Sequence, residues 1–245
     1  MEERRTDIPY IDSSLRHILR VPKECYDCSG IVVNGRRIKS LLFSTDIALI
    51  RNCDADAVFA VYPFTPQQAI SNALISASYV PVFCGIGGGT TKGIRTVTQA
   101  KDVEAQGAMG VVLNAPISDL NLLAVSRAVD IPVIITVVND RTDIAARLKA
   151  GASILNVAGG TSTPALVAKI RAGFPGVPII ASGGASPDSI RATVAAGANA
   201  ITYTPPSTKE LFSTMMATYR EMGASRPRRV VRAVAARRYG PGRRA

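Results

Sequence analysis

The sequence contains no tryptophan, a single histidine and only four cysteines in 245 residues. His17 has no second imidazole with which to share a metal ion, and the pair Cys25-x-x-Cys28 lacks a second pair nearby. We therefore expect no zinc or other transition-metal site. Four cysteines in a chain of this length do not indicate a disulfide scaffold either, which favours a reducing, cytoplasmic location.

Long apolar runs are also missing. No segment approaches the roughly 18 consecutive apolar residues of a membrane span. The N-terminal stretch "MEERRTDIPYIDSS" is polar and has no apolar region of the kind found in secretory signals. The sequence thus predicts a protein without a transmembrane segment.

Acidic residues are absent from 226–245, a segment that contains eight arginines. The net charge is +11, so the rest of the chain is close to balanced. We expect residues 224–245 to form a flexible Arg-rich tail. Such a tail offers phosphate contacts for non-specific nucleic-acid binding, but a solvated appendage without a partner is the favoured interpretation.

Eight apolar, β-rich runs recur with helix-like segments between them. Most are continuously apolar, as parallel strands covered on both faces are. Their spacing is close to one βα unit of a barrel of this length, so we predict a (β/α)₈ TIM barrel over 38–223, with an open doubly wound sheet as the alternative. The runs are 40–45, 57–63, 80–86, 110–116, 132–138, 153–159, 178–184 and 200–206.

Two of the helix-like segments carry clear boundary signals. One has Ser186 as candidate N-cap, a proline at the first helical position, and Gly197 as its end. The other has Thr142 as candidate N-cap and Gly151 as its end.

Residues 1–37 precede the predicted barrel and form an N-terminal extension. "SSLRHILR" suggests a short helix, and Asn34–Gly35 between apolar runs predicts a two-residue hairpin turn. The extension would either close the bottom of the barrel or contact another subunit in a homo-oligomer.

The stretch "GIGGGTTKG" at 85–93 matches neither the P-loop nor the dinucleotide-binding pattern. In a barrel it becomes the loop after the third strand, on the rim where active sites are built. Its glycines would let backbone N–H groups face an anion, and a lysine would add charge. The alternative is a tight turn whose glycines relieve crowding. The candidate ligand contacts are Gly87, Gly88, Gly89 and Lys92.

Gly-Gly pairs end the sixth and seventh predicted strands, each before a helix. They expose unpaired N–H groups at the positive end of a helix dipole, which favours a phosphate or another anion over a purely capping role. The eighth strand adds hydroxyl groups. The candidate anion-binding residues are Gly159, Gly160, Thr161, Ser182, Gly183, Gly184, Thr204 and Ser207.

The segment "VPIIASGGASPDSIRATVAAGANAITY" resembles the last two units of phosphate-binding barrels. These include N-acetylmannosamine-6-phosphate epimerase, indole-glycerol-phosphate synthase and the keto-deoxy-phosphogluconate aldolases, and the segment is also similar to uncharacterised bacterial barrels labelled as hydrolases. The resemblance implies a small phosphorylated or anionic substrate held by Gly183 and Gly184. It departs from these barrels after the eighth strand, where Pro205 and Pro206 offer no N–H. A Schiff-base lysine is also absent from the fourth and sixth strands, which carry Asn114 and Asn156.

A polar ring remains at the predicted rim. Asp46 and Asp140 are the candidate proton-transfer residues because they titrate, although N-capping of the next helix explains them equally well. Asn114, Asn139 and Asn156 would bind carbonyl or hydroxyl groups, or stabilise an enolate. Cys84 lacks an activating base and is expected to be a core residue.

These observations predict an enzyme that acts on a small phosphorylated or anionic sugar or keto acid by proton transfer, as an isomerase, epimerase or lyase. No cofactor is expected, although Mg²⁺ held by a carboxylate and a substrate phosphate would be compatible. The alternatives are a hydrolase that uses the same carboxylates, and a ligand-sensing or RNA-binding regulator similar to glycerol-responsive antiterminators.

Overall fold

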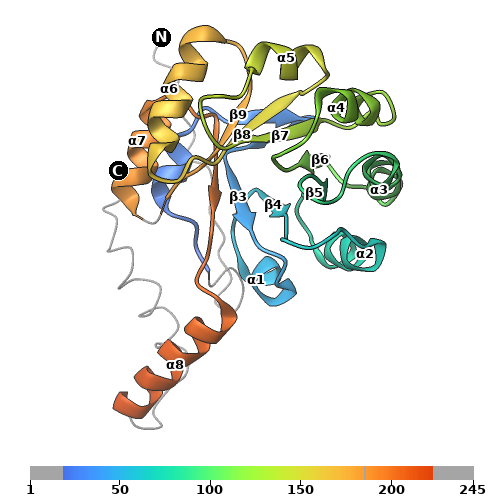
Figure 1. Ribbon diagram of the computed structural model, residues 1–245. Coiled ribbons are helices and arrows are strands. Elements are labelled where there is room, and N and C mark those ends of the chain that lie inside the picture. The colour runs from blue at the N-terminus through green and yellow to red at the C-terminus, as the bar shows by residue number, and fades with distance from the viewer. Residues whose placement is uncertain (1–18, 185, 223–245) are drawn as a thin grey trace, which may run out of the picture.

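A computed structural model describes residues 19–184 and 186–222. Its eight parallel strands close into a barrel in which each strand pairs with the next along the chain and β10 pairs with β3 (Figure 1). The predicted TIM barrel is confirmed, and the open sheet is wrong. The strands are β3 (Ser40–Phe43), β4 (Ala57–Ala60), β5 (Val82–Gly87), β6 (Gly110–Leu113), β7 (Val133–Val137), β8 (Ile154–Val157), β9 (Ile179–Ser182) and β10 (Ala200–Tyr203).

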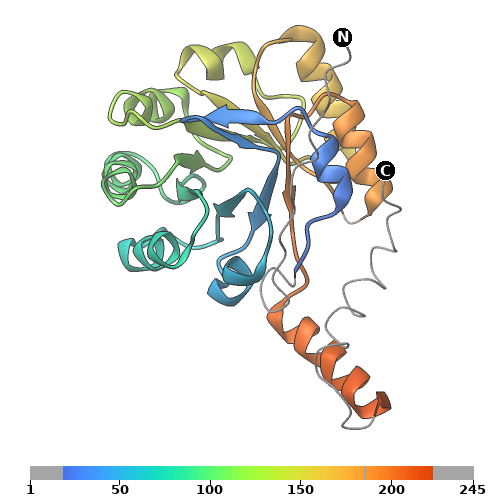
Figure 2. The same cartoon turned by 180° about the vertical axis from the view of Figure 1, so that it is seen from behind.

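Helices follow the strands in alternation, and the first seven surround the barrel (Figures 1 and 2). Their apolar sides pack with the outward faces of the strands in one large core. In the part of the chain that the structure describes, no helix is long and apolar enough to span a membrane. The helices are α1 (Ile47–Asn52), α2 (Gln68–Ala77), α3 (Ile94–Ala105), α4 (Asp119–Ser126), α5 (Ile144–Lys149), α6 (Thr163–Gly173), α7 (Pro187–Ala195) and α8 (Thr208–Met222), with the 3-10 helix η2 (Gly160–Ser162) before α6.

Helix boundaries follow the capping signals of the sequence with one correction. Ser186 caps α7 in a capping box with Ser189, as expected. The predicted cap of α5 at Thr142 is wrong: Asp143 is the N-cap, and its carboxylate accepts a hydrogen bond from the amide of Ala146. The capping acceptor of α5 is therefore a carboxylate one residue after the predicted threonine.

The N-terminal extension closes the lower end of the barrel. The hairpin of β1 (Ile31–Val33) and β2 (Arg36–Ile38) turns through Asn34 and Gly35, both with positive φ, as a two-residue turn of this kind requires. Three of its apolar side chains join the cluster that fills the barrel interior: Ile31, Val33 and Ile38.

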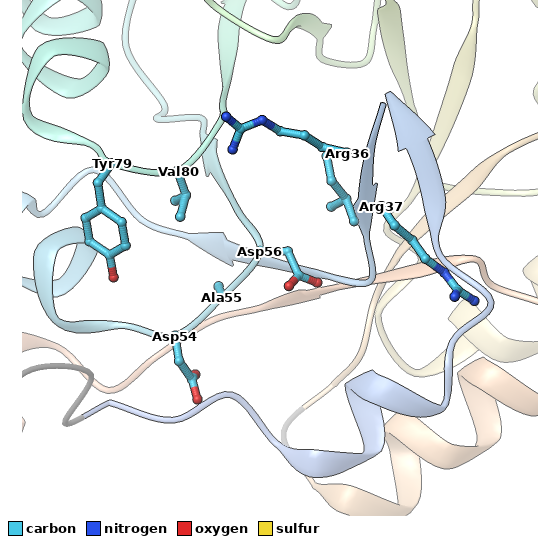
Figure 3. A pocket seen from close by; sticks show the side chains of 8 residues that line it. Arg36, Arg37, Asp54, Ala55, Asp56, Tyr79 and Val80 are labelled. Atoms are coloured by element: carbon cyan, nitrogen blue, oxygen red, sulfur yellow. The ribbon is translucent and has the colours of Figure 1, made fainter. Parts of the chain in front are cut away.

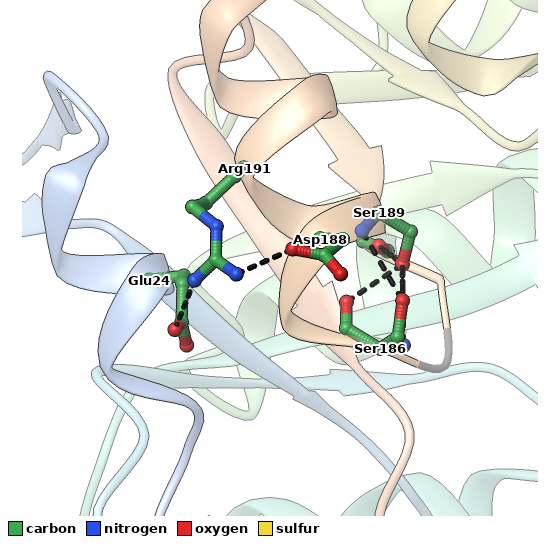
Figure 4. A network of polar contacts seen from close by, with 6 residues as sticks. Glu24, Ser186, Asp188, Ser189 and Arg191 are labelled. Carbon is green, nitrogen blue, oxygen red and sulfur yellow. Dashed lines mark hydrogen bonds and ion pairs between the residues drawn. The ribbon is translucent and has the colours of Figure 1, made fainter.

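The 3-10 helix η1 (Lys23–Asp27) lies beside α7 (Figure 4). The buried Glu24 accepts a 2.8 Å ion-paired hydrogen bond from Arg191, which also pairs with Asp188. This pairing fixes the extension to the outer face of the barrel.

Helix α8 differs from the other helices because it leaves the barrel and points away from it (Figures 1 and 2). Its first residue, Thr208, donates a hydrogen bond to Asp46, the N-cap of α1. The predicted Arg-rich tail, His17 and most of the predicted "SSLRHILR" helix lie outside the described residues.

Candidate active site at the barrel mouth

The barrel interior changes from apolar to polar near the carboxyl ends of its strands. Val112, Ile134 and Ile154 belong to the inward-facing apolar cluster. Because strand side chains alternate, the residues two positions later also face inward. They are Asn114, Thr136 and Asn156.

These three side chains form a hydrogen-bonded chain across β6, β7 and β8. Asn156 Nδ2 donates to Thr136 Oγ1 over 3.2 Å, and Thr136 Oγ1 donates to Asn114 Oδ1 over 3.3 Å. Asn156 is only 6% exposed, and its Oδ1 has no hydrogen-bond partner among the described residues. A buried acceptor without a partner is unusual, so this atom marks the mouth as a place for a ligand.

The remaining inward positions of this layer are mixed in character. By the same alternation, Ser182 and Thr202 follow Ile180 and Ala200 of the interior cluster. The Thr202 hydroxyl donates to the backbone oxygen of Ala181, so its hydrogen bond links β10 to β9. On the opposite wall the layer is apolar, because Val61 packs against the interior cluster and Phe43 contacts Phe59.

The Gly-rich loop after β5 is held by its own backbone. Gly88 N donates to Thr91 O, and Gly89 N donates to Pro116 O, both over 2.9 Å. These two N–H groups are therefore occupied in this structure. Gly87 and Gly88 have positive φ, and a Cβ on Gly88 would lie 2.0 Å from Asn114 O. The glycines thus permit close contact between this loop and β6, while Lys92 is exposed on the same loop.

The loops after β8, β9 and β10 lie at the same end of the barrel, and several of their polar groups are already bonded. Gly159 N donates to Thr163 Oγ1, and Gly183 N donates to Thr202 O. Ser207 and Glu210 cap the first turn of α8. Thr161 and Thr204 are exposed, Gly160 and Gly184 have positive φ, and Asp188 adds a negative charge to the first turn of α7. Anion binding here stays a prediction.

Asp46 is a half-buried carboxylate at the start of α1. Its Oδ1 accepts hydrogen bonds from the amides of Ala48 and Leu49, and its Oδ2 accepts one from Thr208. The Thr208 hydrogen bond, followed by those from the two amides, lowers the pKa of Asp46 below its ordinary value. The side chain is therefore an N-cap that stays ionised at neutral pH.

Asp140 and Asn139 lie on the exposed loop between β7 and α5. Asp140 pairs with Lys169 over 3.2 Å, and this partner lowers the pKa of the aspartate. Asn139 Oδ1 accepts a hydrogen bond from the amide of Arg141. Neither residue belongs to the chain of Asn114, Thr136 and Asn156.

All four cysteines are buried. Burial raises the pKa of Cys25, Cys28, Cys53 and Cys84 to about 12. Because the thiolate is the reactive form, the thiol of Cys84 is suited to packing and not to nucleophilic attack.

We therefore expect the native protein at pH 8 to react with iodoacetamide at least about 100-fold more slowly than the unfolded protein, in which all four thiols ionise normally. Intact-mass spectrometry with and without guanidinium measures the difference. Rapid labelling of one cysteine in the native protein would contradict the burial seen here.

A separate pocket lies at the opposite end of the barrel, between the β1–β2 hairpin and the segment before β4 (Figure 3). Its carboxylates hold parts of the protein: Asp54 accepts from the amide of Val21, and Asp56 accepts from the amides of Lys39 and Ser40. This pocket therefore joins the extension to the barrel and is remote from the mouth.

Comparisons with known proteins agree with this architecture. No family model matches the chain, and no curated protein matches it in sequence. Among solved structures, phosphonopyruvate hydrolase has 15% identity and a TM-score of 0.62, over 84% of this chain and 90% of that chain. Phosphoenolpyruvate phosphomutase from Streptomyces platensis subsp. rosaceus has 15% identity and a TM-score of 0.57, over 81% of this chain and 83% of that one.

A third similar structure is 2,3-dimethylmalate lyase, described as a member of the PEP mutase/isocitrate lyase superfamily. It has 15% identity and a TM-score of 0.56, over 86% of this chain and 91% of that chain. At identities this low, the structural similarity establishes the shared barrel fold alone. The more specific resemblance to the epimerase and the aldolases gains no support from these structures.

Another similar structure is a complex of phosphonopyruvate hydrolase with oxalate and Mg²⁺. In this chain, the described residues contain no cluster of three His, Cys, Asp or Glu side chains that could hold a metal ion. The hydrogen-bonded residues of the mouth are neutral amides and hydroxyls. These three residues supply no carboxylate of their own, so a Mg²⁺ ion held by one carboxylate and a substrate phosphate stays a prediction.

Proposed function

We propose that the protein is an enzyme that acts on a small phosphorylated or anionic keto acid or sugar by proton transfer, as an isomerase, epimerase or lyase. The observation that carries the proposal is the polar layer of Asn114, Thr136 and Asn156 at the mouth of a closed barrel, where barrel enzymes place their active sites. The names of the similar structures, a mutase, a hydrolase and a lyase of small organic acids, support the same substrate class.

In this proposal Asn114 and Asn156 bind the substrate, and a carboxylate at the rim of the barrel transfers the proton. Amide N–H groups fixed in a protein interior stabilise negative charge that develops on a carbonyl oxygen, as in an enolate. Asp46 is the proposed proton acceptor because it is half-buried at the rim and ionised at neutral pH. Ser182 and the glycines after β8 and β9 are the proposed contacts for a phosphate or carboxylate group.

A ligand-binding protein without catalysis is the second candidate. The three hydrogen-bonded residues of the mouth are neutral, so binding there requires no titrating group. A hydrolase would use Asp46 to activate water, and no contact among the described residues favours it over proton transfer.

The proposal predicts that Asp46→Asn lowers turnover by roughly 10²-fold or more, the usual contribution of a general acid or base. Asparagine caps helices as well as aspartate does, so the fold and ligand binding should persist. The assay follows phosphonopyruvate and 2,3-dimethylmalate by ³¹P and ¹H NMR, with affinities from calorimetry.

Asp140→Asn is the matched control, because that carboxylate is exposed and paired with Lys169. Equal turnover in both variants and the wild type would remove Asp46 from the mechanism. Binding of these acids without turnover by the wild-type protein would favour the ligand-binding candidate.

A further inference from the structure

The hydrogen bonds that link Asn156, Thr136 and Asn114 all run in one direction from donor to acceptor. A threonine hydroxyl carries one proton, so Thr136, which accepts from Asn156, uses that proton to donate to Asn114. The two amides are thereby fixed relative to each other, although a strand separates them.

The two ends of the chain offer opposite hydrogen-bonding groups. Asn156 Oδ1 is a buried acceptor without a partner, and within the described residues Asn114 bonds through its oxygen while its Nδ2 donates no hydrogen bond. Turning both amides over exchanges these roles, and the pair still presents one free acceptor and one free donor. A complementary ligand must therefore both donate and accept.

We infer that the mouth selects small organic acids that carry a hydroxyl group, through Asn156 and Asn114 and without a metal ion. The ligand hydroxyl donates to one amide oxygen, while a carboxylate or carbonyl oxygen accepts from the other amide. A keto acid without a hydroxyl has only acceptors, so it leaves one buried amide oxygen unpaired. This inference rests on the proposed function and deepens it by naming the feature that the substrate must carry.

Sites built to bond a hydroxyl reject the analogue that lacks it, because the buried polar group of the site stays unpaired. In the direction seen here, Asn156 is the specificity-determining residue and Thr136 is a positioning residue that sets the orientation of both amides. Thr136 needs no contact with the ligand for this role.

The test uses acids with and without the hydroxyl on the full-length protein. Lactate is compared with pyruvate, and malate with succinate, by calorimetry in buffer containing either EDTA or Mg²⁺. We expect each hydroxy acid to bind at least tenfold more tightly than its partner in both buffers. Equal binding, binding of neither acid, or binding only with Mg²⁺ would overturn the inference.

Three substitutions examine the residues. Asn156→Leu should abolish the preference for the hydroxy acid. Thr136→Val should weaken it severalfold, and Thr136→Ser should restore it. Asn52→Leu is the matched control, because the Asn52 amide bonds Ala48 O within α1 and is remote from the mouth. A preference that survives Asn156→Leu in a folded protein would contradict the role of Asn156.

The outcomes separate this inference from the proposed function. A hydroxy-acid preference without turnover would retain the inference and remove the enzyme proposal. Turnover of a keto acid without any hydroxy-acid preference would do the reverse. The comparison of acids with and without a hydroxyl on the wild-type protein tests the inference even if Asn156→Leu does not fold.

Discussion

Gly88→Ala is expected to destabilise the protein by roughly 2–5 kcal/mol, from a side chain forced into positive φ and an overpacked contact. Gly88 has a φ of +110°, and its added Cβ would lie 2.0 Å from Asn114 O and 2.6 Å from the Asn114 carbonyl carbon. Both are backbone atoms, so no side-chain rotation relieves the overlap. For a chain of this size the melting temperature should fall by about 5–15 °C.

Gly89→Ala is the matched control, because it makes the same change one residue later. Gly89 also has a positive φ, of +63°, but a Cβ there would meet nothing within 4 Å. Only the backbone strain remains, so we expect a loss of about 1–2 kcal/mol. Urea unfolding of the two variants measures the difference, and equal losses would show that the loop does not contact β6 as described.

The Gly88 variant should also affect the mouth. Its new methyl group would displace the backbone of Asn114, whose side-chain oxygen accepts the hydrogen bond from Thr136. A partly folded Gly88→Ala protein should therefore bind the acids less well than Gly89→Ala protein at the same temperature. This links the Gly-rich loop to the site through packing, without requiring it to touch the ligand.

The barrel could be predicted from the sequence because its signals are local. Continuous apolar runs such as 132–138 alternate with capped helices, and that alternation fits few folds. The Asn34–Gly35 turn could be predicted for the same reason. The position of α8 could not be predicted, because the direction of a helix after a strand depends on contacts between segments far apart in sequence.

The candidate site was predicted only in part. Asn114 and Asn156 were identified as polar residues in apolar strands, but Thr136 was missed because threonine is common in strands and gives no signal of its own. Its signal was its position two residues after Ile134, on the inward face. The sequence could not show that Asp46 bonds Thr208 or that Gly88 N bonds Thr91, because those contacts depend on the tertiary fold.

The barrel interior below the mouth should be the most sensitive part of the molecule, and Phe83 lies in it. Its side chain is 1% exposed, and it packs so closely on Gly110 that a Cβ there would lie 2.8 Å from the Phe83 ring. Phe83→Ala should therefore cost about 3–5 kcal/mol, since the closed ring of strands cannot collapse into the cavity. Phe64→Ala, at a side chain that is 74% exposed, is the control and should change stability by less than about 0.5 kcal/mol. Urea unfolding gives both values. A loss below about 1 kcal/mol for Phe83→Ala would mean that the interior is loosely packed, and the mouth above it could not then hold Asn114 and Asn156 in fixed positions.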